Sequence, residues 1–183
     1  MRVFILSTGR AGTTTFTKAS EHITNYTAAH ESTRGMFSPD HLDFPDRHIE
    51  SNPYLTFLLA PLAKRLEGQD VFFVHLQRKR EGVIQSWLRR GPKIGPGKWS
   101  PIAMGTNSRQ LNRDQFEQVC GLCHDAMVGQ VEAFLARIPA DQQMHIWLHE
   151  AAERWPVFWQ KIGAEGDLAA ATAEWSVRHN KGK

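Results

Sequence analysis

Residues 6–16, LSTGRAGTTTF, carry several groups that can bind an oxyanion. Gly9 and Gly12 allow the backbone to approach a charged group closely, and Arg10 offers a fixed positive charge with several N–H donors. The stretch follows an apolar run and precedes a helical pattern, so N–H groups of a first helical turn point toward it. Three hydroxyl groups complete the set: Thr13, Thr14 and Thr15. The pattern predicts a loop that binds a doubly charged anion.

The loop does not fit the Walker pattern of ATP-binding proteins, G-x-x-x-x-G-K-[ST]. Ser7 replaces the first glycine of that pattern, and Thr13 replaces its lysine. Without the lysine, and without an Asp at the end of a second strand to hold Mg²⁺, ATP chemistry is disfavoured. The alternative interpretation is a capped turn between a strand and a helix with no ligand, although bare caps rarely collect so many donors.

A second group of candidate residues lies in VFFVHLQRKREGVIQSWLRR, residues 71–90. Arg78 stands at the end of an apolar strand, and Ser86 follows eight residues later within a helical pattern. Helical spacing stacks Gly82 and Ser86 one turn apart on a more polar side, where the glycine leaves room. This arrangement suits a second phosphate. The alternative is an exposed arginine and a solvent-facing serine.

Together the two stretches resemble the nucleotide-binding motifs of sulfotransferases that use 3′-phosphoadenosine 5′-phosphosulfate (PAPS). R-x-G-T-T after an apolar strand is similar to the 5′-phosphosulfate loop of that family, and the spacing of Arg78 and Ser86 is similar to its 3′-phosphate motif. The resemblance implies that Arg10 holds the bridging oxygen of the donor. It assigns the other contacts with the 5′ end to Ala11, Gly12, Thr13, Thr14 and Thr15.

The resemblance also implies a reaction, the transfer of a sulfuryl group from PAPS to a hydroxyl. No metal is required, because fixed cationic groups take its place. Two other functions stay open: a P-loop small-molecule kinase and a catalytically inactive nucleotide-binding module.

Residues 28–34, AAHESTR, offer the base that such a transfer needs. They follow a predicted strand whose carboxyl end opens on the same edge as the first loop. Glu31 and His30 are the candidates, and Glu31 is preferred. The stretch resembles the segment of tyrosylprotein sulfotransferases in which a Glu beside an Arg acts as the base, but the spacing to Arg34 is E-x-x-R here instead of E-x-R. An exposed Glu31 paired with Arg34 is the alternative.

The chain ends in EWSVRHNKGK, residues 174–183. Sulfotransferases commonly return a basic segment to the 3′-phosphate, so the resemblance implies that Arg178 and Lys181 are further cofactor contacts; a solvated tail is the alternative. Trp99 and Phe37, near the expected mouth of the site, could face sugars, phenols or lipids. The acceptor is therefore expected to be a small molecule or a carbohydrate of unidentified class.

The elements that must position these residues are alternating strands and helices. Continuous apolar runs predict buried strands at Val3–Leu6, Val71–Leu76 and Met144–Leu148, with a weaker one at Tyr26–Ala29. Such runs are typical of a parallel sheet covered on both faces. The sequence predicts an α/β fold similar to P-loop NTPases, with about four to five parallel strands and helices on both faces.

Helix starts are predicted from capping residues. Asn52 precedes Pro53 before a leucine stripe, and Asp114 precedes the long apolar stripe that begins at Phe116. Pro156 is expected to begin the next helix, and Asp167 to cap the last one. Residues 90–109 are predicted to form a long loop.

Bulk composition narrows the function classes. The 183 residues predict a single domain, 1–183. With 22 basic and 19 acidic residues the net charge is +3, too small for a protein that coats nucleic acid. The apolar runs are too short to cross a bilayer, and the first residues lack a signal-peptide pattern. We expect a soluble, cytoplasmic protein without a membrane or nucleic-acid partner; the oligomeric state stays open.

Two further features are expected to be structural. Residues 120–124, CGLCH, match a c-type haem attachment pattern, but both cysteines lie on an apolar helical stripe and are predicted to be buried free thiols. His75 lies inside a predicted buried strand and is expected to be a core histidine whose polar groups are satisfied.

Overall fold

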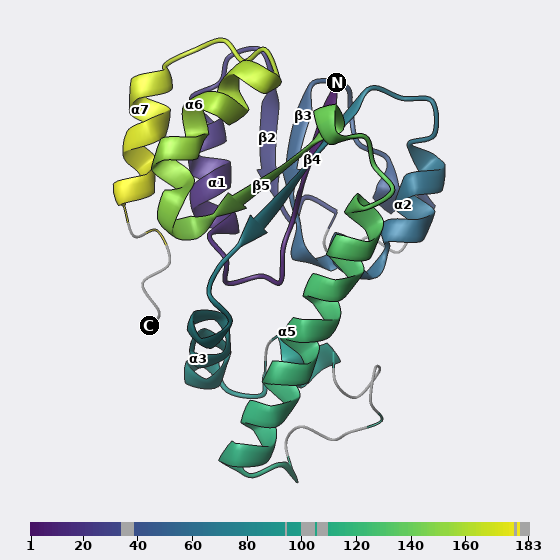
Figure 1. The fold of residues 1–183 in the computed structure, drawn as a ribbon, viewed down its shortest axis with the longest axis vertical. Helices are drawn as coiled ribbons and strands as arrows, with labels where there is room; N and C mark the ends of the chain where they lie inside the picture. The colour runs from purple at the N-terminus through teal and green to yellow at the C-terminus, as the bar shows by residue number, and fades with distance from the viewer. Residues whose placement is uncertain (34–38, 94, 100–104, 106–109, 178, 180–183) are drawn as a thin grey trace.

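The computed structural model describes residues 1–33, 39–93, 95–99, 105, 110–177 and 179. Within them, five parallel strands form one sheet in the order β2-β3-β1-β4-β5 (Figure 1). The strands are β1 (Arg2–Leu6), β2 (Thr27–His30), β3 (His48–Ser51), β4 (Val71–Gln77) and β5 (Gln143–Trp147). All of their carboxyl ends lie at one edge of the sheet, and β1 lies at its centre. The predicted α/β class is confirmed.

Helices cover both faces of the sheet, as Figure 1 shows. One face carries α1 (Thr13–Ser20), α6 (Ala151–Lys161) and α7 (Leu168–Ala173), and the other carries α2 (Leu59–Arg65) and α5 (Arg113–Leu135). The helix α3 (Arg80–Arg90) lies beyond the carboxyl edge and packs against α5. Shorter 3₁₀ helices are η1 (Pro39–Leu42), η2 (Pro53–Phe57), η4 (Ala140–Gln142), η5 (Leu148–Glu150) and η6 (Glu174–Ser176).

Alternate residues of β1 supply two separate cores. Val3 and Ile5 belong to the core under α1 and α6, whereas Phe4 and Leu6 belong to the core under α2 and α5. Both sets of side chains are fully buried. This two-sided burial explains why β1 is continuously apolar in sequence.

The strand β3 was not predicted. It lies between β1 and β2, and its four residues, HIES, are all buried. Ile49 packs in the core under α1, but His48 and Glu50 are polar, so the strand lacks an apolar run. A polar strand can be buried here because its side chains find hydrogen-bond partners on other segments.

Two of the predicted helix starts are confirmed, and two are wrong. The Asn52 and Asp167 side chains each accept a hydrogen bond from a first-turn N–H group. The cap of α5 is Asn112 instead of Asp114, and Asn112 forms a reciprocal capping box with Gln115. Pro156 lies inside α6, which begins at Ala151 because the buried stripe of that helix starts there. In the predicted long loop, residues 96–99 form one helical turn.

Cys120 and Cys123 are free and buried, as predicted. Burial raises the pKa of the Cys120 thiol to about 12 and also raises that of Cys123, so neither is a reactive thiolate.

His75 is buried, but its Nδ1 atom has no hydrogen-bond partner among the described residues. The expectation of a fully satisfied histidine is therefore wrong. Burial in the apolar sheet, and the positive charges of His145 and His124, lower the pKa of His75 to about 4.

None of the described helices is both long and apolar enough to cross a membrane.

Candidate functional site

The backbone of the loop between β1 and α1 adopts a conformation that lets a ligand approach its N–H groups closely. Three of its residues have positive φ angles: Gly9 at 71°, Arg10 at 58° and Gly12 at 106°. Gly12 is the N-cap of α1, and no side chain in the described part of the chain caps this helix. A Cβ atom on Gly12 would lie 2.6 Å from Leu148 Cδ1, so a side chain there would displace the end of Leu148 and would also have to adopt a φ angle that favours glycine. The N-terminus of α1, with its positive dipole end, therefore faces the loop without a side-chain cap.

The structure brings the two predicted anion-binding stretches into direct contact. Arg10 Nε donates a hydrogen bond to the buried hydroxyl of Ser86 at 3.0 Å, across 76 positions of sequence. Arg78 Nη1 donates to the Arg10 carbonyl oxygen at 3.1 Å. The contact is possible because β1 and β4 are neighbours in the sheet, so the segments that follow them meet at the carboxyl edge.

Gly82 leaves room, as predicted, and the guanidinium of Arg78 occupies that room. A Cβ atom at position 82 would lie 2.9 Å from Arg78 Nε and 3.4 Å from Arg78 Cζ. Arg78 therefore packs across the first turns of α3, with Ser86 one turn further along the helix. A larger residue at position 82 would displace this guanidinium.

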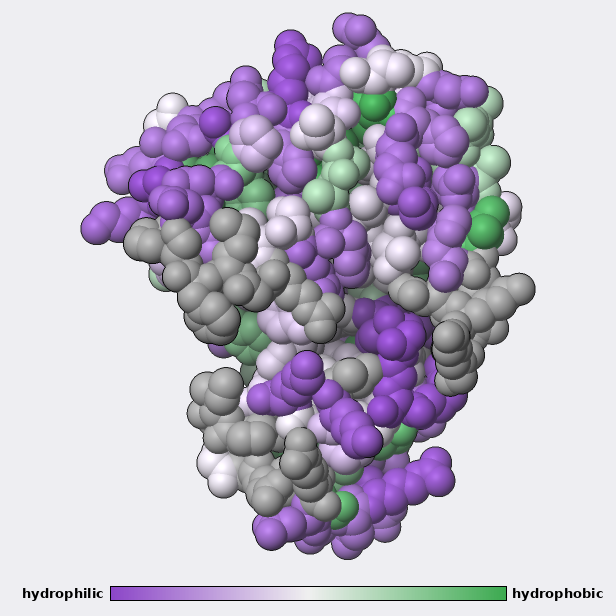
Figure 2. Space-filling view, turned by 180° about the vertical axis from the view of Figure 1, so that it is seen from behind, coloured by the Kyte–Doolittle hydropathy of each residue, from purple (hydrophilic) through white to green (hydrophobic). Residues whose placement is uncertain are grey.

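Four arginines make this part of the edge strongly positive. The pKa of Arg10 is lowered mainly by partial burial and further by the charges of Arg90, Arg78 and Arg89. We call these four residues the arginine cluster. Seen from behind, the molecule narrows between the sheet body and the end that holds α3, and strongly hydrophilic side chains gather there (Figure 2). Like charges at this density favour a bound anion.

The two candidate bases lie at the end of β2. His30 Nε2 is 3.0 Å from the hydroxyl of Thr13, the first residue of α1. The N–H of Glu31 donates to the Ser51 carbonyl oxygen at 3.2 Å. Arg34 lies outside the described residues, so its predicted pairing with Glu31 is not addressed. The candidate bases and the first loop thus lie at the same edge of the sheet.

The sequence interpretation missed Glu50, a fully buried carboxylate on β3. Its Oε1 accepts a hydrogen bond from the Ser32 N–H at 3.0 Å, and its Oε2 accepts one from the Ser32 hydroxyl at 2.6 Å. Glu50 Oε2 also lies 3.2 Å from His48 Nε2, and His48 Nδ1 lies 2.7 Å from the Thr27 hydroxyl. The run HIES offers no sequence signal for this role, because the hydrogen-bond partners Ser32 and Thr27 lie on other segments.

The other predicted contacts are only partly described. Arg178, Lys181 and Phe37 lie outside the described residues. The Trp99 ring meets the rings of Tyr54 and Phe57 edge-on, with centroids 6.1 and 5.3 Å apart. These two residues belong to η2, which is tied to the first loop because the Thr56 hydroxyl donates to the Ser7 carbonyl oxygen. Aromatic side chains therefore lie on a segment attached to the loop.

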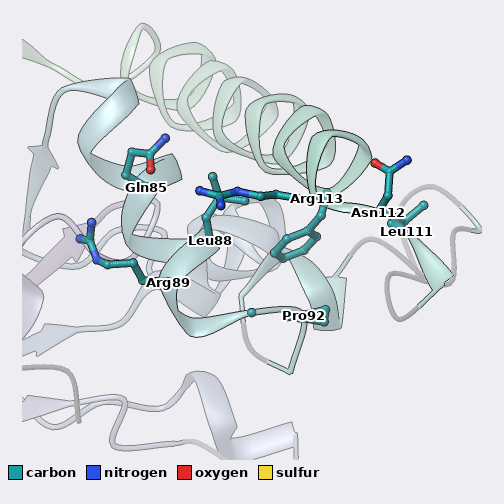
Figure 3. A pocket seen from close by; sticks show the side chains of 9 residues that line it. Gln85, Leu88, Arg89, Pro92, Leu111, Asn112 and Arg113 are labelled. Atoms are coloured by element: carbon teal, nitrogen blue, oxygen red, sulfur yellow. The ribbon is translucent and has the colours of Figure 1, made fainter.

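A pocket of about 430 Å³ lies between the end of α3 and the start of α5 (Figure 3). In Figure 3 the Arg113 side chain extends toward Leu88, whereas the guanidinium of Arg89 points away from Leu88 and Arg113. The lining residues are Gln85, Leu88, Arg89, Gly91, Pro92, Leu111, Asn112, Arg113 and Phe116. Arg10, Arg78 and Ser86 are not among them, so this pocket adjoins the arginine cluster only through Arg89. No group of three or more His, Cys, Asp or Glu side chains that could hold a metal occurs in the described ranges.

Comparison with known proteins supports the fold. The structure is similar to that of a sulfotransferase domain from the curacin biosynthetic pathway, with a TM-score of 0.66 and 11% sequence identity. The match covers 99% of this chain and 80% of that one. No family model and no curated protein matches the sequence. The chain therefore has a sulfotransferase-like fold.

Proposed function

We propose that this protein is a PAPS-dependent sulfotransferase that transfers a sulfuryl group to a hydroxyl of an acceptor. The observation that carries the proposal is the contact between Arg10, Arg78 and Ser86 at the carboxyl edge. One of these residues comes from a loop suited to a 5′-phosphosulfate, and the other two come from a motif suited to a 3′-phosphate. The sulfotransferase-like fold agrees with this assignment.

In the proposed complex, the loop and the start of α1 hold the 5′ end of the donor. The contacts come from Arg10 and from the segment Ala11, Gly12, Thr13, Thr14 and Thr15. Arg78 and Ser86 hold the 3′-phosphate, which distinguishes PAPS from ATP. Arg178 and Lys181 are proposed as additional partners of that phosphate. Arg10 exchanges its hydrogen bond with Ser86 for one with the donor, since a charged ligand is the stronger partner for a guanidinium.

The proposed reaction is an in-line transfer. The acceptor oxygen forms a bond to sulfur while the bond between sulfur and the bridging oxygen of the 5′-phosphate breaks. The electron pair of that bond stays on the departing 3′-phosphoadenosine 5′-phosphate. Arg10 and the N–H groups at the start of α1 stabilise the negative charge that develops there.

The acceptor hydroxyl gives its proton to Glu31 in this mechanism. His30 is the alternative base, and its contact with Thr13 keeps it beside the first loop. A side chain in this position removes the proton as the oxygen attacks, so an alkoxide need not form first. The acceptor class stays open between small molecules and carbohydrates.

Calorimetric titration with 3′-phosphoadenosine 5′-phosphate and with AMP tests the donor site, because the two ligands differ only in the 3′-phosphate. We expect the bisphosphate to bind more tightly than AMP. Arg78→Ala should weaken bisphosphate binding by about 1.5–3 kcal/mol, the range for a hydrogen bond to a charged group, and should change AMP binding little. Arg80→Ala is the matched control: Arg80 lies two residues on and is paired with the exposed Asp125.

The two rival functions give different results. A P-loop kinase would bind Mg²⁺–ATP more tightly than the bisphosphate. An inactive nucleotide-binding module would bind the bisphosphate but transfer no sulfate from ³⁵S-labelled PAPS to water or to a panel of phenols, sugars and alcohols. If Arg78→Ala weakens the two adenine nucleotides equally, the 3′-phosphate assignment is wrong.

A further inference from the structure

Glu31 has a backbone conformation that is uncommon for a residue with a side chain. Its φ angle is 54°, in the left-handed region. Residues other than glycine keep such a conformation only where the surrounding structure holds it, and they cluster at functional sites. The structure should therefore contain a device that holds Glu31.

Two consecutive residues of β3 supply that device. The N–H of Glu31 donates to the Ser51 carbonyl oxygen at 3.2 Å. The N–H of the next residue, Ser32, donates to the carboxylate of Glu50 at 3.0 Å. Rotation about φ moves the first of these peptide groups relative to Glu31, and rotation about ψ moves the second. The two hydrogen bonds therefore fix both backbone dihedrals of Glu31 from one neighbouring strand.

Glu50 is an unusual choice for a purely structural role. It is fully buried, and it lies beside Phe4 of β1 in the sheet register. Burying a carboxylate is costly, and an apolar side chain often serves a core equally well. Both carboxylate oxygens accept hydrogen bonds from the exposed Ser32, and Oε2 also lies 3.2 Å from Nε2 of the buried His48 on the same strand. Two of the contacts of the Glu50 carboxylate are therefore with Ser32, the residue that follows Glu31.

We propose that Glu50 is a positioning residue for the base. It holds the turn at Glu31 in the conformation in which Glu31 takes the proton of the acceptor. Glu50 acts through Ser32 and does not itself touch the substrate. This inference rests on the proposed function, because Glu50 has its effect through the role of Glu31.

The test is a double-mutant cycle measured on the full chain. Glu50→Gln and Ser32→Ala are each made in the parent and in Glu31→Ala, and the release of sulfate from PAPS to water is followed as a function of PAPS concentration. Ser32 is exposed, so Ser32→Ala should fold even if Glu50→Gln does not. Ser32→Thr restores the hydroxyl. Thr24→Ala is the matched control. Thr24 lies in the loop between α1 and β2, and its exposed hydroxyl donates to the Glu165 carbonyl oxygen.

We expect Glu50→Gln to lower kcat by roughly 10- to 100-fold, as for a misplaced catalytic group, with KM for PAPS changed less than about twofold. Ser32→Ala should lower kcat less, because it removes only the hydroxyl bond to Oε2 and keeps the N–H bond to Oε1. Ser32→Thr should recover most of the rate, and Thr24→Ala should match the parent. In the Glu31→Ala background the same two substitutions should have almost no further effect, since residues that act as a unit are not additive.

Two results would overturn the inference while leaving the proposed function intact. One is an equal loss of rate with and without the Glu31 carboxylate, which would make Glu50 a structural residue. The other is an unchanged kcat in both Glu50→Gln and Ser32→Ala. A parent protein that neither binds 3′-phosphoadenosine 5′-phosphate nor releases sulfate would instead overturn the proposed function, and the inference with it.

Discussion

The two halves of the carboxyl edge have opposite chemistry. The ends of β1 and β4 bring together arginines and a serine, whereas the ends of β2 and β3 bring together a histidine and two carboxylates. In the first half, the charges of Arg78, Arg89 and Arg90 lie close enough to Arg10 to lower its pKa. In the second half, a buried carboxylate is fully engaged in hydrogen bonds. We infer that Arg78 and Ser86 in the first half bind the donor and that the second half removes the acceptor proton, so that substitutions at Arg78 and at Glu31 should separate affinity from rate.

The largest expected effect belongs to the reactive half. Glu31→Ala should lower kcat for sulfate transfer by about 10²- to 10⁴-fold, the usual contribution of a general base. The affinity for 3′-phosphoadenosine 5′-phosphate, measured by calorimetry, should stay near that of the parent. Glu21→Ala, which removes an exposed glutamate paired with Lys18, is the control. A larger loss in His30→Ala than in Glu31→Ala would assign the base to His30.

The next effect concerns the pH dependence of folding stability, which should depend on His75 in the strand β4 beneath the first half. The pKa of His75 on β4 is lowered to about 4, below the value of about 6.5 in an unfolded chain. The unfolded chain therefore binds more protons between these values, and stability present above pH 6.5 should fall as the pH drops toward 4. The loss should reach up to about 3 kcal/mol. Urea unfolding at several pH values measures it.

His75→Leu is the variant that isolates this contribution. Its stability should depend less on pH than that of the parent within the same window. Thr24→Ala provides the control, because it removes an exposed hydroxyl and no titratable group and should leave the pH dependence as it is. Parallel curves for the parent and His75→Leu would contradict the assignment.

A smaller effect is expected from Gly82→Ala. The new Cβ atom would displace the Arg78 guanidinium, which packs across the glycine. Binding of 3′-phosphoadenosine 5′-phosphate should weaken about tenfold, while the helix itself gains up to about 1 kcal/mol from alanine. Gly129→Ala in α5 is the matched control, since a Cβ atom there meets no other atom within 4 Å. It should stabilise the protein without changing nucleotide affinity.

The smallest effect concerns a helix start outside both halves. Asn112→Ala removes the capping box of α5 and should lower the free energy of unfolding by about 1 kcal/mol. Nucleotide affinity and kcat should both stay unchanged. A change in either would show that the start of α5 contributes to the site, and the separation between the two halves would then be too simple.

The parts of the fold that could be predicted from sequence are those in which local pattern and burial agree. The strands β1 and β4 are mostly apolar, and β5 buries Met144 and Ile146; all three were found to within a residue at each end. The strand β3 was missed because His48 and Glu50 owe their burial to partners on other segments. No pattern within HIES carries that information.

The candidate site shows the same limit. The spacing of Arg78 and Ser86 indicated one anion-binding motif, and the first loop indicated another. The hydrogen bond between Arg10 and Ser86 could not be read from either stretch, because it depends on β1 and β4 being neighbours. Glu50 was missed for the further reason that it acts on a segment 18 positions away.

The arginine cluster has a practical consequence for handling the protein. A net charge of +3 suggests weak adsorption to cation exchangers, but the clustered guanidinium groups concentrate positive potential at one spot. The ligand-free protein should be retained on phosphocellulose more firmly than its overall charge implies. Under the proposed function, micromolar 3′-phosphoadenosine 5′-phosphate in low-salt buffer should elute the protein, because the nucleotide would occupy the same guanidinium groups.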